Sequence, residues 1–145
     1  MKKKILIRKL TAEDADAISR IYSSITQKPV KMDFRRIIEE QVPKNENACY
    51  VAEHEGTVIG YMISYVLSGA FGLEKSAWIA LMGVDPKYMG QGIGDRLARR
   101  IFKFYKEIGI KDIYTSVRWD STDLLSFFKT LGFDRSNFIN LRKKL

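Results

Sequence analysis

The sequence predicts an α/β fold: a single domain, residues 1–145, in which a mixed central β-sheet is flanked by about four helices. A chain of 145 residues is long enough for one sizeable core and too short for two. Apolar residues recur at helical spacing in some segments and at strand spacing in others. No internal repeat and no linker rich in Pro, Gly or Ser divides the chain. We therefore expect one sandwich of helices packed on a sheet.

The N-terminal part is predicted to contain one strand and two helices. Residues 5–10 begin with an apolar run and form the first strand. Thr11 and the Ala-Glu-Asp that follows it are typical of a helix entrance. The apolar residues after it recur at helical spacing: Ala17, Ile18, Ile21, Tyr22 and Ile25. Residues 34–41 form a second helix, with Pro43 just beyond its end.

The middle of the chain changes to strand periodicity. Residues 48–53 and 58–67 are predicted to be strands, joined by a tight turn at Glu55-Gly56. Residues 76–84 are a nearly continuous apolar run, which indicates a strand buried on both faces. This run therefore belongs to the centre of the sheet.

The C-terminal part is predicted to alternate helix and strand. Residues 94–107 form an amphipathic helix. Its apolar stripe consists of Ile93, Leu97, Ile101, Tyr105 and Ile108. A strand at 112–117, a helix at 122–131 and a final strand at 137–145 complete the predicted order: strand, two helices, three strands, helix, strand, helix, strand.

Composition favours a cytoplasmic protein without a membrane or nucleic-acid partner. The net charge is +8, but the basic residues are spread along the chain, and there is no zinc-finger or RNP-like motif. The uncharged stretch 57–73 is shorter than the roughly 20 apolar residues of a helical span and contains Gly and Ser. A single cysteine, Cys49, excludes an internal disulfide and fits a reducing compartment.

The most informative segment is the loop after the central strand. The strand ends at Val84, and Pro86 prevents its ladder from continuing. Gly90, Gly92 and Gly94 then lead directly into the amphipathic helix. Glycines allow a sharp turn, and the helix offers unpaired N–H groups at the positive end of its dipole, so this loop is a predicted seat for a phosphate or pyrophosphate. A P-loop and a Rossmann fingerprint both fail on spacing and context.

The segment resembles the acetyl-CoA-binding motif of the GNAT (GCN5-related) N-acetyltransferases, Val-x-Pro-x-x-Arg-Gly-x-Gly-x-Gly or Ala. The order of elements agrees along nearly the whole chain, and Leu131-Gly132-Phe133 matches the Leu-Gly-Phe that closes the family's second motif. The resemblance implies a V-shaped cofactor cleft between the strand ending at Val84 and the strand ending at Val117. It also implies acetyl-CoA as co-substrate, and no metal is expected.

The resemblance assigns the cofactor-binding residues. The pantetheine would pair with the backbone of Met82, Gly83 and Val84. The pyrophosphate would lie on the amides of the glycine loop: Met89, Gly90, Gln91, Gly92, Ile93 and Gly94. The helix from Thr122 would flank the other side, through Ser121, Phe127 and Phe128. Phe127 and Phe128 are in the first place expected to be core residues.

The sequence departs from the family pattern at Met89, where Arg or Gln is usual. Lys87, or the pair Arg96 and Arg99, would then supply the lost charge. The alternative for the two arginines is a solvated helix face, which we favour.

The catalytic residues are less clearly marked. The tyrosine that serves as general acid in many relatives falls at Phe128, and a glutamate base found in some relatives falls near Ser116. Asp120 is the nearest other candidate base, although its place before a helix favours a capping and dipole role. Direct attack with proton removal through water stays open.

The predicted activity is transfer of an acetyl group from acetyl-CoA to a primary amine in a ternary complex. The acceptor is a small amine, or an amino group of a peptide or protein. The alternative is a non-catalytic acyl-CoA-binding sensor or scaffold, and a homodimer is left open.

Overall fold

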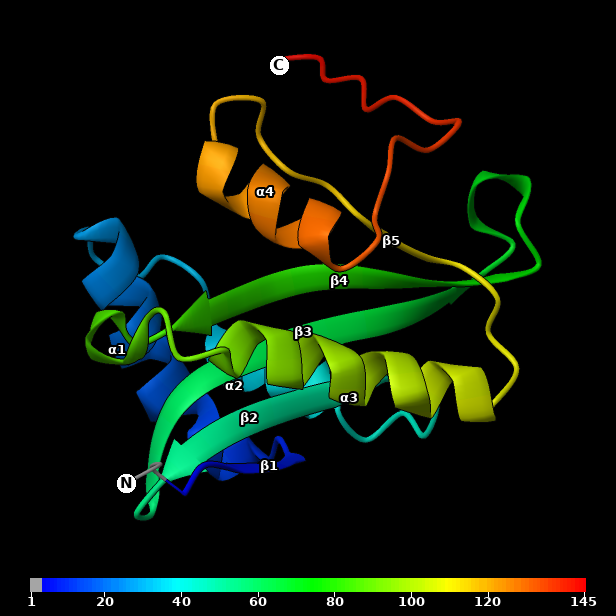
Figure 1. The fold of residues 1–145 in the computed structure, drawn as a ribbon. Helices are drawn as coiled ribbons and strands as arrows, with labels where there is room; N and C mark the ends of the chain where they lie inside the picture. The colour runs from blue at the N-terminus through cyan, green and yellow to red at the C-terminus, as the bar shows by residue number, and fades with distance from the viewer. Residues whose placement is uncertain (1–3) are drawn as a thin grey trace. The chain divides into compact units, whose positions relative to one another are not determined.

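The computed structural model describes residues 4–145 and contains two compact units, Met1–Thr115 and Ser116–Leu145 (Figure 1). The first unit holds a five-stranded sheet whose strands follow one another in chain order. All neighbours are antiparallel except the last pair, which is parallel. The strands are β1 Leu6–Lys9, β2 Cys49–His54, β3 Thr57–Ser68, β4 Lys75–Val84 and β5 Ile113–Thr115. The sheet is mixed, as predicted.

Helices cover both faces of this sheet. They are α1 Ala15–Thr26, α2 Phe34–Gln41 and α3 Ile93–Glu107. Two neighbouring positions show which helix lies on which face. A Cβ added to Gly60 would meet Ile93 and Leu97 of α3, whereas one added to Gly83 would meet Tyr61 and Ile25 of α1. Gly83 pairs with Tyr61, the residue after Gly60, and successive side chains of a strand point to opposite faces. α3 therefore lies on one face and α1 on the other.

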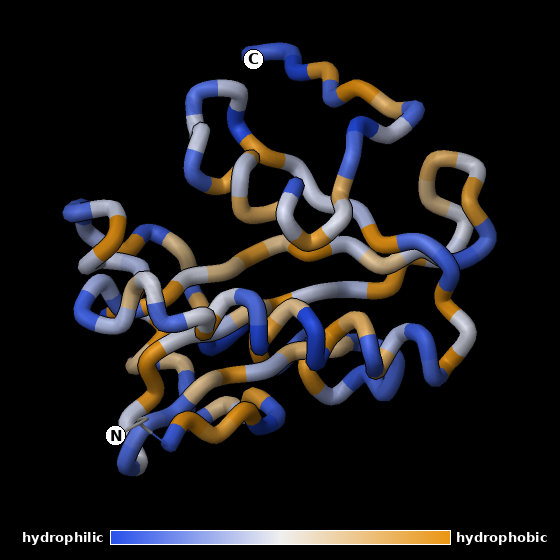
Figure 2. Tube along the Cα trace, in the orientation of Figure 1, coloured by the Kyte–Doolittle hydropathy of each residue, from blue (hydrophilic) through white to orange (hydrophobic). Residues whose placement is uncertain are grey.

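The apolar core lies mainly between the sheet and α1–α2. It includes Ile18, Ile21, Phe34, Ile38, Val51, Tyr61 and Ile63, each with at most 2% of its surface exposed. On the other face, buried Ile93, Leu97 and Ile101 form the inner stripe of α3. Hydropathy accordingly alternates along α3 in Figure 2. These stripes are the ones that the apolar spacing predicts.

The guanidinium group of Arg8 connects β1 to the start of the first helix. Arg8 donates to both carboxylate oxygens of Asp14 over 2.9 Å and to Glu53 over 3.1 Å. Burial by itself would raise the pKa of Asp14, but hydrogen bonds from Arg8 and from the Thr11 N–H outweigh it and hold that pKa below its usual value. The short 3-10 helix Ala12–Asp14 that leads into α1 is thereby fixed.

The second unit contains α4, Thr122–Thr130. Phe128 is its buried centre, with edge-to-face contacts of 5.1 Å to Phe127 and to Phe133. This confirms that Phe128 is a core residue.

The predicted last strand, 137–145, is wrong, because this segment has no regular structure. A strand needs a neighbour for its N–H and C=O groups, and the sheet of the described residues ends with β5. The apolar residues that suggested it are exposed: Phe138, Ile139, Leu141 and Leu145. The predicted strand 112–117 is also shorter than expected, since β5 ends at Thr115.

Candidate functional site

Among the strands of residues 4–145, the second half of β4 has a neighbour on one side only. β5 pairs with Ala77, Trp78 and Ile79 and then stops, whereas β4 continues to Val84 along β3. Opposite β3 the register shifts between Ile63 and Ser64, which leaves Ala80 as an extra residue, a β-bulge. A bulge bends its strand and increases its twist. This one lies where the pairing with β5 ends, so β4 has an open edge from Ala80 to Val84.

The backbone of Met82 and Val84 points to this open edge. The Asp85 N–H donates to the carbonyl of Ile59 on β3 over 2.8 Å, so Asp85 turns its backbone groups toward β3. Backbone groups alternate between the two edges along a strand. Those of Met82 and Val84 therefore face the side without a neighbour, where a ligand chain can pair with them.

A compact turn follows the open edge. Asp85 caps the 3-10 helix Pro86–Tyr88, its Oδ1 accepting from the Lys87 N–H over 3.0 Å. The Tyr88 N–H donates to the Asp85 carbonyl over 2.8 Å. Met89, which comes next, is 61% exposed. This turn ends the strand and directs the chain toward α3.

Two glycines of the loop adopt backbone angles that favour glycine. Gly90 and Gly92 have φ of +79° and +76°, in the left-handed region that residues with a Cβ adopt at a cost. A Cβ at either position would meet nothing within 4 Å, so the loop borders open space. The first helical hydrogen bond at this end runs from the Arg96 N–H to the Gly92 carbonyl. The N–H groups of Ile93, Gly94 and Asp95 thus precede the helical ladder and can bind an anion.

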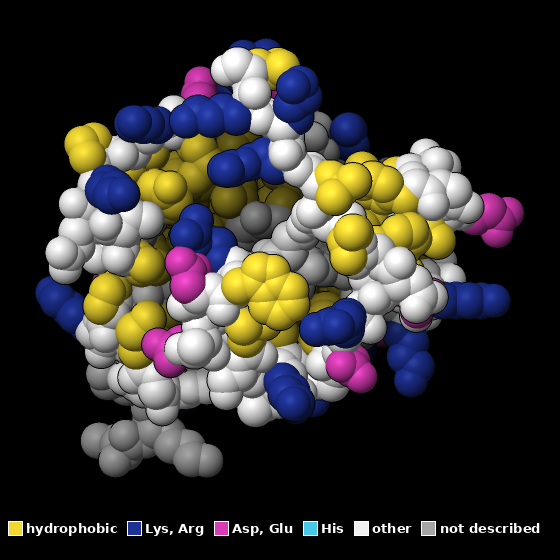
Figure 3. All heavy atoms as spheres, turned by 90° about the horizontal axis from the view of Figure 1, so that it is seen from above, with side chains coloured by type: hydrophobic (Ala, Val, Ile, Leu, Met, Phe, Trp, Pro, Cys, Tyr) yellow, Lys and Arg dark blue, Asp and Glu magenta, His cyan; other side chains and the backbone are white. Residues whose placement is uncertain are grey.

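Two arginines of α3 form hydrogen bonds within the first unit. Arg96 donates to the carbonyl of Ile5 over 2.9 Å, and Arg99 pairs with Asp95 over 2.8 Å. Lys and Arg side chains are spread over the face seen in Figure 3 rather than gathered into one patch. These contacts agree with the interpretation of Arg96 and Arg99 as a solvated helix face.

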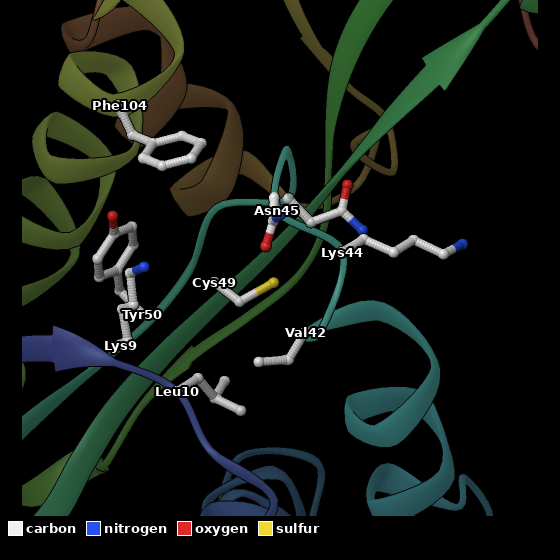
Figure 4. A pocket seen from close by; sticks show the side chains of 9 residues that line it. Lys9, Leu10, Val42, Lys44, Asn45, Cys49, Tyr50 and Phe104 are labelled. Carbon is white, nitrogen blue, oxygen red and sulfur yellow. The ribbon is translucent and has the colours of Figure 1, made fainter. Parts of the chain in front are cut away.

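A separate small cavity lies away from the glycine loop, between β1, β2 and the C-terminal half of α3 (Figure 4). Its volume is about 80 Å³, and Lys9, Val42, Asn45, Cys49 and Phe104 are among its lining residues. Burial raises the pKa of the Cys49 thiol to about 11, which keeps it protonated and unreactive at neutral pH. The cavity is too small for a cofactor, and Cys49 is a buried core residue.

The candidate catalytic residues belong to the second unit. Asp120 accepts two hydrogen bonds from Arg118, of 2.9 and 2.8 Å, and both side chains are largely exposed. The hydrogen bond from Arg118 lowers the pKa of Asp120, which weakens it as a base. Ser116 Oγ accepts a 2.8 Å hydrogen bond from the Asn140 amide.

The capping role expected for Asp120 is wrong. Ser121 is the N-cap residue of α4, and it makes no side-chain cap hydrogen bond. Arg118 engages both carboxylate oxygens of Asp120 instead. Asp123 lies in the first turn of the helix, where its charge suits the helix dipole.

The sequence pattern does not predict two features of the site. The bulge at Ala80 depends on the register between β3 and β4, which is set by contacts distant in sequence. The ring of His54, at the end of β2, lies 5.8 Å from the ring of Tyr88 in the turn before the glycine loop. Across residues 4–145, no cluster of three or more His, Cys, Asp or Glu could hold a metal ion, and no helix is long and apolar enough to cross a membrane.

Comparisons with protein-family models and with curated proteins both find acetyltransferases. The model of the Acetyltransferase (GNAT) family matches residues 15–133. Among curated proteins, the chain is 28% identical over 136 residues to the mycothiol acetyltransferase of Amycolatopsis mediterranei (strain U-32). The match covers 85% of this chain but only 44% of that relative, so the chain spans less than half of the relative's length.

Solved structures share the fold at low identity. One is an aminoglycoside acetyltransferase from an uncultured soil metagenomic sample in complex with sisomicin, with a TM-score of 0.80 at 21% identity over 97% of this chain and 96% of that one. Another is an aminoglycoside N-acetyltransferase in complex with CoA, with a TM-score of 0.82 at 13% identity over 99% of this chain and 97% of that one.

Proposed function

The chain belongs to the acetyltransferase (GNAT) family, and on that premise we propose that it transfers an acetyl group from acetyl-CoA to a primary amine. The resemblance read from the glycine loop is confirmed at the level of the family, and with it the prediction of an N-acetyltransferase fold and enzyme class. Acetyl-CoA as the donor, the amine acceptor and direct transfer in a ternary complex are the proposed part.

One observation carries the proposal: the open edge of β4 runs straight into the glycine loop. A pantetheine chain on this edge would pair with the backbone of Met82 and Val84. Its pyrophosphate would then reach the N–H groups from Gly90 to Gly94 at the positive end of the α3 dipole, beside Met89, whose own N–H donates to the Pro86 carbonyl over 3.4 Å. Ser121, Phe127 and Phe128, in the second unit, remain proposed cofactor-binding residues. Backbone groups do most of this binding, so Met89 in place of a basic residue is compatible with it.

The chemistry requires a neutral amine, a donor for the oxyanion and a leaving thiolate. The amine nitrogen attacks the thioester carbon, the C–S bond breaks, and the amine loses one proton. The N–H of Val84 on the open edge is the proposed donor to the oxyanion. Backbone donors of this kind are fixed in place before the reaction, so they cost no reorganisation.

Proton removal is proposed to go through water. Asp120 is the candidate side-chain acceptor, yet Arg118 lowers its pKa and solvent surrounds both groups. Ser116 is a hydroxyl already engaged by Asn140. Neither is the matched, shielded base that contributes a factor of about 10²–10⁴ in many enzymes. We therefore propose that the acceptor reaches the thioester already neutral, and that Asp120 and Ser116 contribute little to the rate.

The acceptor is proposed to be a small amine or the amino group of a peptide, in the cytoplasm. The relatives leave this choice open, since their names include a mycothiol acetyltransferase and an aminoglycoside acetyltransferase in complex with sisomicin. The net charge of +8 makes a strongly basic protein tail a less suitable acceptor.

Two measurements test the proposed function. Calorimetry with acetyl-CoA should show one site per chain, and thiol release with a panel of amines should show turnover. Binding without turnover on any amine would favour the alternative, a non-catalytic acyl-CoA sensor, for which Phe128 at the family's tyrosine position is the supporting observation. Absence of binding would refute both.

A further inference from the structure

One buried tyrosine has a hydroxyl group that no part of the fold binds. Tyr61 of β3 is 1% exposed, and within residues 4–145 no other group forms a hydrogen bond with its hydroxyl. Tyr105, which is 3% exposed, shows the usual arrangement: its hydroxyl accepts from the Ala48 N–H over 3.0 Å and lies 2.6 Å from Ser64 Oγ. Because buried polar groups are nearly always paired, the hydroxyl of Tyr61 calls for another explanation.

The ring of Tyr61 lies across β4. Tyr61 pairs with Gly83 in the β3–β4 ladder. A Cβ added to Gly83 would lie 2.8 Å from Cε1 and 3.0 Å from Cζ of Tyr61, which are atoms at the hydroxyl end of the ring. The ring therefore extends from β3 over a residue of β4 that has no side chain, and the hydroxyl on Cζ points away from β3. The ring lies on the α1 face, since Ile25 of α1 would meet the same Cβ at 3.0 Å.

The hydroxyl of Tyr61 points toward the open edge of β4. At Gly83, β3 occupies one edge of β4, and the pairing with β5 has already ended at Ile79. The direction away from β3 therefore leads to the edge that Met82 and Val84 border. Across residues 4–145, every fully buried side-chain oxygen or nitrogen has a hydrogen-bond partner. Since the Tyr61 hydroxyl has none in the protein, the small exposed area of this residue includes its oxygen, which a ligand on the open edge can reach.

The surroundings of Tyr61 keep its hydroxyl protonated. Burial raises the pKa of Tyr61 to about 12, with a smaller contribution from Tyr22. At neutral pH the group is therefore a hydrogen-bond donor and not a base. Gly83 and Val84 are neighbours, and consecutive residues of a strand are about 3.3 Å apart. One ligand oxygen can thus accept from the Val84 N–H in the plane of the sheet and from the Tyr61 hydroxyl on the α1 face.

We propose that Tyr61 is a catalytic residue, whose hydroxyl joins the Val84 N–H in binding the carbonyl oxygen of the acetyl group. The amine nitrogen forms a bond to the carbonyl carbon, and the π electrons of the C=O bond move to this oxygen. Two donors fixed in place then stabilise its negative charge. When the electron pair returns, the C–S bond breaks, the thiolate leaves with the bonding electrons, and the amine proton passes to water. Tyr61 keeps its proton throughout. This inference rests on the proposed function for the place of the acetyl group.

The variant Tyr61→Phe keeps the ring and removes the hydroxyl. Its kcat should fall about 100-fold, the lower end of the effect of removing one oxyanion donor. The assay is thiol release from acetyl-CoA, with the amine that the wild type acetylates fastest. The affinity for acetyl-CoA in calorimetry should stay near the wild-type value, because the negative charge develops only in the transition state.

Tyr65→Phe is the matched control. Tyr65 lies on the same strand and the same face as Tyr61, but it pairs with Trp78, where β5 still occupies the other edge of β4. Its kcat should therefore equal that of the wild type. The urea midpoint of Tyr61→Phe should equal or exceed the wild-type midpoint, since the lost hydroxyl has no partner in the protein.

Infrared spectroscopy tests the contact without an acceptor. Acetyl-CoA labelled with ¹³C at the thioester carbonyl is bound to the wild type and to Tyr61→Phe. A donor to the oxygen lowers the carbonyl stretching frequency, so this frequency should be lower in the wild type. Equal frequencies, or equal kcat values of the wild type and Tyr61→Phe, would overturn the inference. An equal loss of kcat in Tyr65→Phe would do so as well, because it would indicate a general effect of packing.

The two proposals fail separately. Absence of acetyl-CoA binding to the wild type would refute the proposed function, and with it the place of the acetyl group. Turnover by the wild type together with an unimpaired Tyr61→Phe would retain the acetyl transfer and refute the role of Tyr61 alone.

Discussion

Gly92 gives the sharpest test of the proposed pyrophosphate seat. It is the N-cap residue of α3, with φ of +76° and open space where a Cβ would stand. Asn and Asp tolerate the left-handed region better than other residues with a Cβ. Gly92→Asn and Gly92→Asp therefore place side chains of the same shape at the same strained position. They differ only by one negative charge that faces the bound phosphates.

The size of the effect follows from Coulomb's law. At about 5 Å and an effective dielectric constant of about 20, two unit charges repel each other by about 3 kcal/mol. Salt reduces this at an exposed loop, and we take about 2 kcal/mol. A tenfold change in affinity corresponds to about 1.4 kcal/mol, so Gly92→Asp should bind acetyl-CoA about 30-fold more weakly than Gly92→Asn.

The thermal stability of the two variants should differ in the opposite sense to their affinity for acetyl-CoA. A carboxylate near a helix N-terminus stabilises the helix by about 0.3–1 kcal/mol, so the Tm of Gly92→Asp should equal or exceed that of Gly92→Asn. Calorimetry with acetyl-CoA measures the difference in affinity, and S-acetylpantetheine, which lacks the pyrophosphate, serves as the control ligand. Equal acetyl-CoA affinities in two folded variants would refute the placement of the phosphates on this loop.

Three further variants test the scaffold and the chemistry. Asp14→Asn should cost about 2 kcal/mol in urea unfolding at pH 7, because it removes the more buried of the two carboxylates that pair with Arg8 and leaves only Glu53. Since the folded-state pKa of Asp14 is lowered, the wild-type advantage is complete above the unfolded pKa of about 4 and should be lost as the pH falls from there through the folded-state pKa. Gly83→Ala should cost about 1–3 kcal/mol in the same assay, because its Cβ would lie 2.8 Å from the Tyr61 ring. Asp120→Asn should change kcat by less than about threefold, and a loss of about 100-fold would restore Asp120 as general base.

Local signals predict the helices well. The predicted helix 34–41 has the bounds of α2 because its ends are chemically marked. Asp33 Oδ1 accepts from the Arg36 N–H over 3.1 Å at one end, and Pro43 follows the other. The glycine loop is similarly local, since the left-handed φ of Gly90 and Gly92 needs glycine at those positions.

The pairing of strands depends on residues that are distant in the sequence, and the sequence pattern does not predict it. Residues 137–145 contain apolar side chains in a strand-like density, but a strand exists only beside a neighbour that the segment itself does not specify. The preference of Asp120 for Arg118 over a capping position is also a choice between two nearby partners that spacing leaves undecided. The stack of Trp78 on Tyr114 depends on the β4–β5 register, which a single strand does not reveal.

Both parts of the proposed cofactor seat arise because β4 loses its neighbours one after the other. It loses β5 after Ile79, where the bulge at Ala80 bends the strand, and it loses β3 after Asp85, where Pro86 ends the ladder. Unpaired backbone groups are costly unless water or a ligand reaches them. The unpaired edge at Met82 and the N–H groups around Gly92 both lie beside accessible space. One strand and the loop that follows it therefore offer two sets of backbone groups without partners, at Met82 and Val84 and at the start of α3, which suits a long, flexible ligand that ends in phosphates.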